Sequence, residues 1–338
     1  MTSSPLSTDE PSSSGFSSSR ALVTGSVALG AVLTGAVLRR IRRQRRPAPE
    51  DLPPALQAEV RTSELMEGRV RYYARPGGGV PIVLLHSINA AGSSFEMKPI
   101  FDHLAAATHR PLYALDWLGF GRSDRPPVAY RPELYQRQLR RFLSEHLREP
   151  ADLVALSLAA EYAAAVASDA PFLVRKLVLI SPTGLDADLS RSALVRHLVG
   201  LSDRVGVFEL AFDRLTRPAS LRRFYAEQVF LDGRLVPDEL VHYAHVTAGA
   251  RGAHHAPRRF VAGQLFMGEA AWEAYVRLAV PTQIFTPRDA ASTVQRFDRL
   301  PDLVHRNVDV RARTMPTGLL PHWEAPGLLL PALSDFLT

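Results

Sequence analysis

From about residue 62 onward, short apolar runs alternate with helix-like stretches. This alternation is typical of a mostly parallel sheet flanked by helices. The strand-sized apolar runs lie at 70–74, 80–86, 111–115, 153–155, 177–180, 283–285 and 308–310. Between residue 184 and about 267 the strand signal lapses and the sequence is helical and aromatic. We therefore expect an α/β core over 62–184 and 268–338, with a helical cap inserted over 185–267.

A longer apolar stretch precedes this alternation. Residues 21–38 carry no charge over 18 positions and follow a Ser-rich leader, residues 1–20, that we expect to be disordered. A helix of that length spans about 27 Å at ~1.5 Å per residue, close to the ~30 Å hydrocarbon core of a bilayer. The sequence therefore predicts a transmembrane helix over 21–38. Its small residues leave an unanchored tail as one alternative, and a cleaved signal peptide is the other, although its charges should precede the apolar run.

The distribution of charge bears on the partners of the chain. With 40 Lys+Arg and 34 Asp+Glu, the formal charge is +6, which resembles that of a nucleic-acid-binding protein. Six arginines between residues 39 and 46 account for this excess, so the rest of the chain is formally neutral. A basic cluster beside an apolar helix stays on the cytoplasmic side of a membrane. We expect no nucleic-acid partner and a membrane-anchored, cytoplasmic catalytic domain that follows an Arg-rich flank and Pro-rich linker over 39–61.

Cysteine is absent from the chain. A disulfide scaffold, a Cys-ligated zinc site, an iron–sulfur cluster and thiol catalysis are therefore excluded. The histidines at 242, 245, 254 and 255 do not have the spacing of a zinc site. We expect no metal and no cofactor.

A candidate nucleophile lies where a buried strand passes directly into an Ala-rich helix. Ser157 stands between Ala155 and Ala159, which gives the small-x-Ser-x-small form of a nucleophile elbow. Small neighbours are needed because the serine occupies a strained turn. The amide of Leu158, at the start of the helix, favours developing negative charge. The alternative is an ordinary strand-to-helix turn that carries a polar residue.

Two segments upstream of the elbow carry further motifs. Residues 81–101 read as a strand, a turn of small and polar residues, and a helix, and residues 112–126 read as a strand ending at Asp116 before a Gly-x-Gly-x-Ser loop. In this order along the chain, the segments resemble the α/β-hydrolase fold superfamily, in particular its cap-bearing esterase, lipase and haloperoxidase-like members. The resemblance covers about residues 68–338. It implies that the amide of Ile88 supplies the second donor of an oxyanion hole.

The resemblance also implies the partners of the serine, which needs a base and a carboxylate to orient that base. His322 precedes a C-terminal helix in a His-x-x-x-Pro segment that is similar to the family's catalytic histidine region. Asp289 follows a predicted strand at the position where the family commonly carries its acid. Some members place the acid after the preceding strand, so Asp186 or Asp188 is the alternative. The order of serine, acid and histidine is the one expected for this fold.

These residues predict a serine hydrolase that cleaves a carboxylic ester through Ser157, His322 and Asp289 with an acyl-enzyme intermediate. The substrate is a small acyl compound, and the anchor and apolar cap favour a lipid-like one, with Trp117 and Trp323 lining its pocket. An acyltransferase, a C–C hydrolase or a cofactor-free perhydrolase with the same triad are alternatives. So is a catalytically silent membrane-tethered binding protein, which the missing glycines at 87, 155, 159 and 286 favour.

Overall fold

The computed structural model describes residues 46–186, 207–288 and 295–338. The predicted leader and transmembrane segment lie outside these residues, as do Asp188 and Asp289. Among the described residues, no helix combines the length and the hydrophobicity that crossing a membrane requires. The folded unit begins at Pro47.

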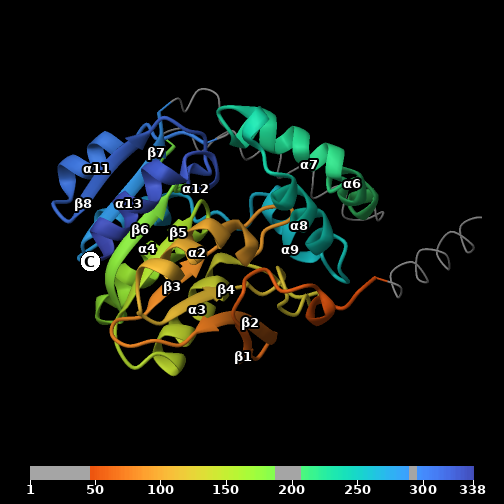
Figure 1. Ribbon diagram of the computed structural model, residues 1–338, viewed down its shortest axis with the longest axis horizontal. Helices are drawn as coiled ribbons and strands as arrows, with labels where there is room; N and C mark the ends of the chain where they lie inside the picture. Colours follow the sequence, from red (N-terminus) through yellow and green to blue (C-terminus); the bar gives the residue numbers. More distant parts are fainter. Residues whose placement is uncertain (1–45, 187–206, 289–294) are drawn as a thin grey trace, which may run out of the picture. The chain divides into compact units, whose positions relative to one another are not determined.

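A single sheet of eight strands, counted over the described ranges, forms the centre of this unit (Figure 1). Its strand order is β1-β2-β4-β3-β5-β6-β7-β8. The pairs β1–β2 and β2–β4 are antiparallel, and the other neighbours are parallel. The bounds are β1 (Glu59–Leu65), β2 (Gly68–Arg75), β3 (Ile82–Leu85), β4 (Leu112–Leu115), β5 (Ala151–Leu156), β6 (Val174–Ile180), β7 (Thr282–Pro287) and β8 (Val310–Met315).

Helices cover both faces of the sheet. The helices outside the predicted cap are α2 (Lys98–Ala107), α3 (Pro132–His146), α4 (Ala159–Asp169), α10 (Glu269–Val276), α11 (Leu300–Arg306), α12 (Pro321–Glu324) and α13 (Pro326–Leu337). Along β3, Val83 and Leu85 join the core cluster that contains α3, α4 and α10, whereas Ile82 and Leu84 join the cluster that contains α2 and α13. Successive side chains of a strand point to opposite faces, so these helix groups lie on opposite sides of the sheet. The central strands carry continuous apolar runs at 82–85, 153–156 and 177–180 because both of their faces are covered there.

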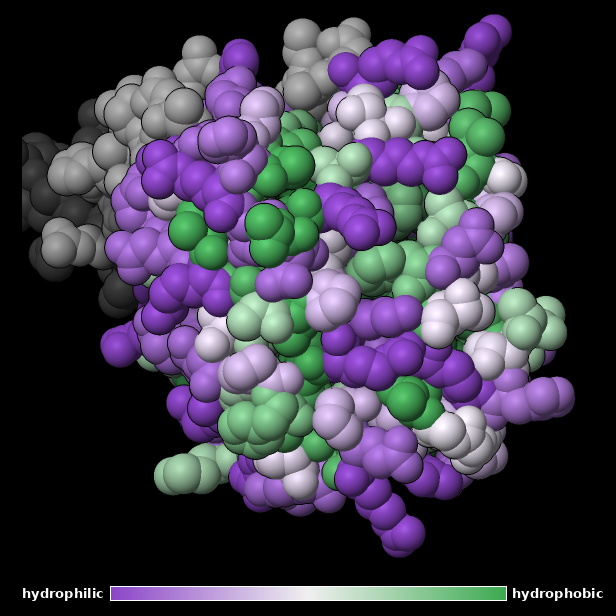
Figure 2. Space-filling model, turned by 90° about the vertical axis from the view of Figure 1, so that its left-hand side faces the viewer, coloured by the Kyte–Doolittle hydropathy of each residue, from purple (hydrophilic) through white to green (hydrophobic). Residues whose placement is uncertain are grey.

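The segment between β6 and α10 contains four α-helices in its described part. They are α6 (Val207–Leu215), α7 (Pro218–Phe224), α8 (Asp238–Ala248) and α9 (His255–Val261). All four fall within the range 185–267 that the sequence assigns to a cap, and Figure 1 shows them gathered at one side of the molecule. Figure 2 views the side where α11, β8 and α13 lie, and its hydrophobic areas are small and separated by polar side chains. Such scattered apolar residues are ordinary on a globular surface.

Three segments differ from the sequence prediction. Strand β1 is an additional strand, and its sequence Glu-Val-Arg-Thr-Ser-Glu-Leu contains no apolar run because five of its seven residues are exposed or half-buried. Strand β8 begins at Val310 rather than Val308, because Val308 is 92% exposed in a turn where the Asn307 side chain accepts the amide of Asp309. The expected linker over 39–61 does not extend through its C-terminal part, because Leu52 is buried and β1 starts within it.

Candidate active site

Ser157 lies between the end of β5 and the start of α4. Its backbone has φ 55°, and among the described non-glycine residues only Ser181 shares this left-handed conformation. That conformation costs a non-glycine residue on the order of 1–3 kcal/mol and is concentrated at functional sites. The flanking Ala155 and Ala159 are fully buried, so larger side chains would clash there. The strained elbow therefore presents a partly exposed serine at the end of the sheet where the parallel strands terminate.

Two backbone amides belong to the same end of the sheet. Strands β3 and β5 are parallel neighbours with Leu85 opposite Ala155, so Ile88 and Leu158 leave the sheet from adjacent strand ends. Within the described part of the chain, neither amide donates a hydrogen bond to another group. The helix α4 begins directly behind Leu158 and adds the positive end of its dipole. Both amides are thus available to an anionic oxygen near Ser157.

A buried carboxylate supports the loop that carries Ile88. Glu96 is 3% exposed and accepts the amide of Ser87 at 2.9 Å through Oε2 and the Nδ2 of Asn89 at 2.7 Å through Oε1. Burial raises the pKa of Glu96 to about 7, although these hydrogen bonds oppose the rise. Ser87 and Asn89 flank Ile88, so the carboxylate contacts the loop on both sides of the candidate donor.

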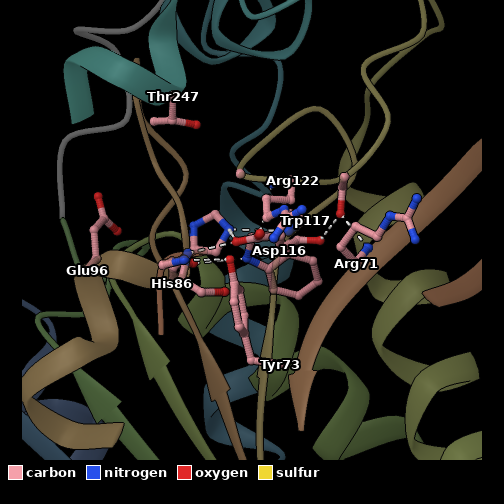
Figure 3. Close-up of polar contacts among 12 residues, drawn as sticks. Arg71, Tyr73, His86, Glu96, Asp116, Trp117, Arg122 and Thr247 are labelled. Atoms are coloured by element: carbon pink, nitrogen blue, oxygen red, sulfur yellow. Dashed lines mark hydrogen bonds and ion pairs between the residues drawn. The ribbon is translucent and has the colours of Figure 1, made fainter. Parts of the chain in front are cut away.

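His86 and Trp117 form a second set of contacts beneath this loop (Figure 3). The Nδ1 of His86 lies 2.6 Å from the Ser87 carbonyl, and the Trp117 amide donates to Nε2 at 3.2 Å. Nδ1 therefore carries the proton, and burial lowers the pKa of His86 to about 4, which keeps the ring neutral. Asp116, beside it, accepts the amides of Ser94 and Arg122, both at 2.8 Å.

These contacts assign structural roles to two motif residues. A Cβ at Gly121 would lie 2.1 Å from the carboxylate carbon of Asp116, which explains the glycine of that loop. Trp117 is fully buried, donates its indole N–H to the His86 carbonyl at 2.9 Å and packs edge-on against Tyr135 and Tyr162. It therefore lies in the core rather than lining a pocket, because Tyr135 of α3 and Tyr162 of α4 pack against its ring.

His322 lies in the short helix α12 and is fully buried. Its Nε2 donates to the main-chain carbonyl of Glu96 at 2.8 Å, and the indole N–H of Trp323 donates to the same oxygen at 2.8 Å. A carbonyl only accepts, so Nε2 carries the proton. Burial lowers the pKa of His322 to about 4. Its Nδ1 is buried with no hydrogen-bond partner among the described residues.

The structure does not pair His322 with Ser157. The Oγ of Ser157 instead accepts a hydrogen bond of 2.7 Å from the Nε2 of Gln295. No motif marks Gln295, and only the fold brings it to the serine across 138 positions. Trp323 is half-buried and stacks on Phe95 with ring centroids 5.9 Å apart.

Of the three candidate acids, only Asp186 lies within the described residues. Asp289 lies just outside the described residues, beyond Arg288, whose amide donates to the Met315 carbonyl at 2.7 Å. Asp186 is described and half-buried, six residues beyond the end of β6. In the described part of the chain, no three acidic or histidine side chains gather as metal ligands.

Glu161, in the first turn of α4, is a second buried carboxylate. It accepts the Thr183 hydroxyl and, at 2.7 Å, the amide of Met267. Thr183 follows β6 and Met267 precedes α10, so Glu161 joins the two connections of the inserted helices to the core. Burial raises its pKa to about 7.

Replacing Glu161 with glutamine should change the pH dependence of stability. The folded protein keeps a proton on Glu161 that the unfolded chain releases above about pH 4.5. The contribution of this carboxyl group to the free energy of unfolding is therefore complete below pH 4.5 and is lost as the pH rises through about 7. The free energy of unfolding of the wild type should therefore fall relative to that of Glu161→Gln by on the order of 3 kcal/mol between pH 4.5 and about pH 8. Urea unfolding across this range measures the difference, and a constant difference would contradict the assignment.

Comparison with known proteins agrees with this architecture. Residues 80–205 match the family model described as alpha/beta hydrolase fold. An uncharacterized protein of Mycobacterium tuberculosis is 31% identical over 149 residues, which are 44% of this chain and 41% of the relative. The chain thus matches less than half the length of that relative.

Solved structures extend the similarity over most of the chain. A probable hydrolytic enzyme of Pseudomonas aeruginosa has a TM-score of 0.68 at 17% identity, covering 88% of this chain and 99% of its own. The carboxylesterase CesB of Bacillus subtilis has a TM-score of 0.61 at 16% identity, with 89% and 97% covered. The epoxide hydrolase CorEH has a TM-score of 0.64 at 17% identity, with 82% and 98% covered. The family match over residues 80–205, the sheet order and the solved structures agree that the chain has the α/β-hydrolase fold.

Proposed function

We propose that this chain is a serine hydrolase that cleaves carboxylic esters through Ser157. The observation that carries the proposal is the elbow, where a left-handed serine stands at the end of β5. Beside it are two backbone amides without a partner among the described residues. Solved relatives of this fold act on different substrates, so the substrate class rests on the site and not on the fold.

In the proposed reaction, the Oγ of Ser157 attacks the carbonyl carbon of the ester while His322 accepts its proton. The amides of Leu158 and Ile88 stabilise the oxyanion, and His322 returns the proton to the departing alcohol. Water then attacks the acyl-enzyme with His322 again as base, which releases the acid and restores the serine. Asp289 orients the imidazole and stabilises its cation, with Asp186 as the alternative acid.

The observed tautomer sets a requirement on this mechanism. A ring nitrogen that donates to the Glu96 carbonyl cannot accept a proton from serine. His322 must therefore present an unprotonated nitrogen to Ser157. This nitrogen is Nδ1 in the tautomer described above, or Nε2 if the ring proton has moved from Nε2 to Nδ1. Gln295 donates to the serine oxygen and leaves the hydroxyl proton of Ser157 available for transfer.

A chain-length series of p-nitrophenyl esters, from acetate to palmitate, tests the proposal. We expect saturable hydrolysis of at least one ester, and the preferred acyl length would report the size of the acyl pocket. An absence of hydrolysis across the series would count against an esterase.

One observation favours a second candidate, a catalytically silent binding protein. His322 is hydrogen-bonded to Glu96 and Ser157 to Gln295, and among the described residues no hydrogen bond joins the serine to its proposed base. A silent protein would bind acyl compounds without turnover and would not react with a fluorophosphonate. The enzymatic proposal requires reaction at Ser157.

We also propose that residues 21–38 anchor the domain at the inner face of a membrane. The support is the uncharged run of 18 residues followed by six arginines. The anchor would bring the site close to lipid-like esters.

Deleting residues 1–46 should move the protein from the membrane fraction to the supernatant, because the proposed anchor and its basic flank are removed together. The deletion stops before Pro47, whose carbonyl accepts the amide of Arg251, so the folded unit keeps this contact. Ultracentrifugation with immunoblotting measures the distribution, and circular dichroism checks folding. Full-length protein in the supernatant, or truncated protein that still sediments with membranes, would contradict the anchor.

A further inference from the structure

Glu96 contacts both halves of the candidate active site through different atoms. It belongs to the 3₁₀ turn Ser94–Met97, between β3 and α2. Its carboxylate faces the loop that follows β3, and its main-chain carbonyl faces α12, more than two hundred residues later in the sequence. Glu96 lies within the segment 81–101, where no local pattern gives it a chemical role.

The carboxylate arm fixes the loop around Ile88. One oxygen accepts the amide of Ser87 and the other accepts the side-chain amide of Asn89. Asn89 also donates to the Ser87 hydroxyl at 2.6 Å and accepts the amide of Ala91 at 2.7 Å. Every one of these contacts orients the backbone on either side of Ile88. A shift of this backbone would move the amide that faces the oxyanion.

The carbonyl arm fixes the candidate base. The Nε2 of His322 and the Nε1 of Trp323 both donate to the same carbonyl oxygen at 2.8 Å. The ring of Phe95, the preceding residue, stacks on Trp323 and on Tyr243 of α8. The turn that carries Glu96 is therefore packed against the segment that carries the histidine.

A purely structural role would not require a carboxylate at this position. Burying an ionised group is costly unless it is paired or well hydrogen-bonded, and an apolar residue would fill the same space without that cost. A carboxylate is the side chain that accepts from a backbone amide and a side-chain amide at once and donates to neither. The chemistry of Glu96 thus matches the two donors that flank Ile88.

We propose that Glu96 is a positioning residue for the esterase reaction. Its carboxylate holds the oxyanion-hole loop, and its carbonyl holds His322 in the resting tautomer. This inference rests on the proposed function. Glu96 does not touch the reacting atoms. It connects the loop that presents the amide of Ile88 to the segment that carries His322.

Exchanging donor and acceptor between residues 89 and 96 tests the proposal. Glu96→Gln places an amide against the Asn89 amide, and Asn89→Asp places a second carboxylate against Glu96. Each single variant should lower kcat by ~10- to 100-fold, because removing an oxyanion donor outright costs ~10²–10³-fold and a displaced one costs less. KM should change by less than about threefold, since ground-state binding does not use the oxyanion contact.

The double variant Asn89→Asp/Glu96→Gln restores the pairing with the roles reversed. The new glutamine amide donates to the new aspartate, which can still accept the amide of Ala91. Its kcat should recover to within about fivefold of the wild type. Thermal unfolding of all variants checks that each is folded. Should Glu96→Gln fail to fold, Asn89→Ala removes only the side-chain amide donor, and it should also lower kcat with little change in KM.

Glu161→Gln is the matched control. Glu161 is equally buried and its pKa is also raised to about 7, but its carboxylate contacts Thr183 and Met267 rather than the loop around Ile88 or the segment that carries His322. Its kcat should stay within about threefold of the wild type. An active wild type whose Glu96→Gln variant keeps full kcat would overturn this inference alone. A folded double variant no better than the single variants would overturn it as well. A wild type that hydrolyses no ester would overturn the proposed function and the inference together.

Discussion

Replacing Ser157 with alanine should lower kcat for the preferred p-nitrophenyl ester by ~10⁵–10⁶-fold, the cost seen when a serine nucleophile is removed from a triad. The elbow geometry and the amides of Leu158 and Ile88 stay in place, so some acceleration over the uncatalysed reaction should remain. Steady-state kinetics at saturating substrate measures the change. A variant that keeps more than a small fraction of the activity would show that the oxygen of Ser157 does not form the acyl-enzyme.

Ser181→Ala is the matched control for that substitution. Ser181 is the other described serine with a positive φ, at 45°, and it too follows a central strand. It is fully buried and donates to the Leu319 carbonyl at 2.9 Å, so its oxygen holds a loop and does not face a substrate. Its loss should reduce stability and leave kcat within about tenfold of the wild type.

The substitution Asp289→Asn should lower kcat by ~10⁴-fold, because an amide neither holds the required tautomer of His322 nor stabilises its cation. The effect should be large here because the Nδ1 of His322 is buried and, among the described residues, has no hydrogen-bond partner. A carboxylate that reaches this nitrogen would draw the ring proton from Nε2 to Nδ1 and leave Nε2 free to accept the proton of Ser157. Steady-state kinetics with the preferred ester as substrate measures the loss of kcat.

Asp186→Asn is the paired variant for this prediction. Both aspartates follow a central strand of the sheet, so the two substitutions are chemically equal and differ in position. Asp186→Asn should keep kcat within about threefold of the wild type. If Asp186→Asn loses most of its kcat while Asp289→Asn keeps near-normal kcat, the catalytic acid is Asp186 and not Asp289.

The sequence predicts those parts of the fold that local chemistry determines. The strands β3, β5 and β6 are recognisable because both of their faces are buried and their apolar residues are continuous. The elbow at Ser157 is recognisable because a strained turn demands small neighbours at 155 and 159. Both features depend on a few consecutive residues.

The remainder depends on contacts between distant parts of the chain. The edge strand β1 has exposed side chains and therefore no apolar signature. Leu52 lies in a Pro-rich segment whose composition predicts a linker, yet tertiary packing buries it. Gln295 and Glu96 reach Ser157 and His322 only through the fold, and no local pattern distinguishes them from other polar residues. Trp117 adjoins a motif, but its burial follows from the packing of α3 and α4.

Covalent labelling with a fluorophosphonate probe tests the central claim most directly, because it requires an activated serine and no knowledge of the substrate. We predict one adduct per chain by intact mass, mapped by peptide analysis to Ser157 and retained in Ser181→Ala. We predict no adduct in Ser157→Ala. A wild type that forms no adduct, or an adduct that persists in Ser157→Ala, would contradict the assignment of this chain as a serine hydrolase acting through Ser157.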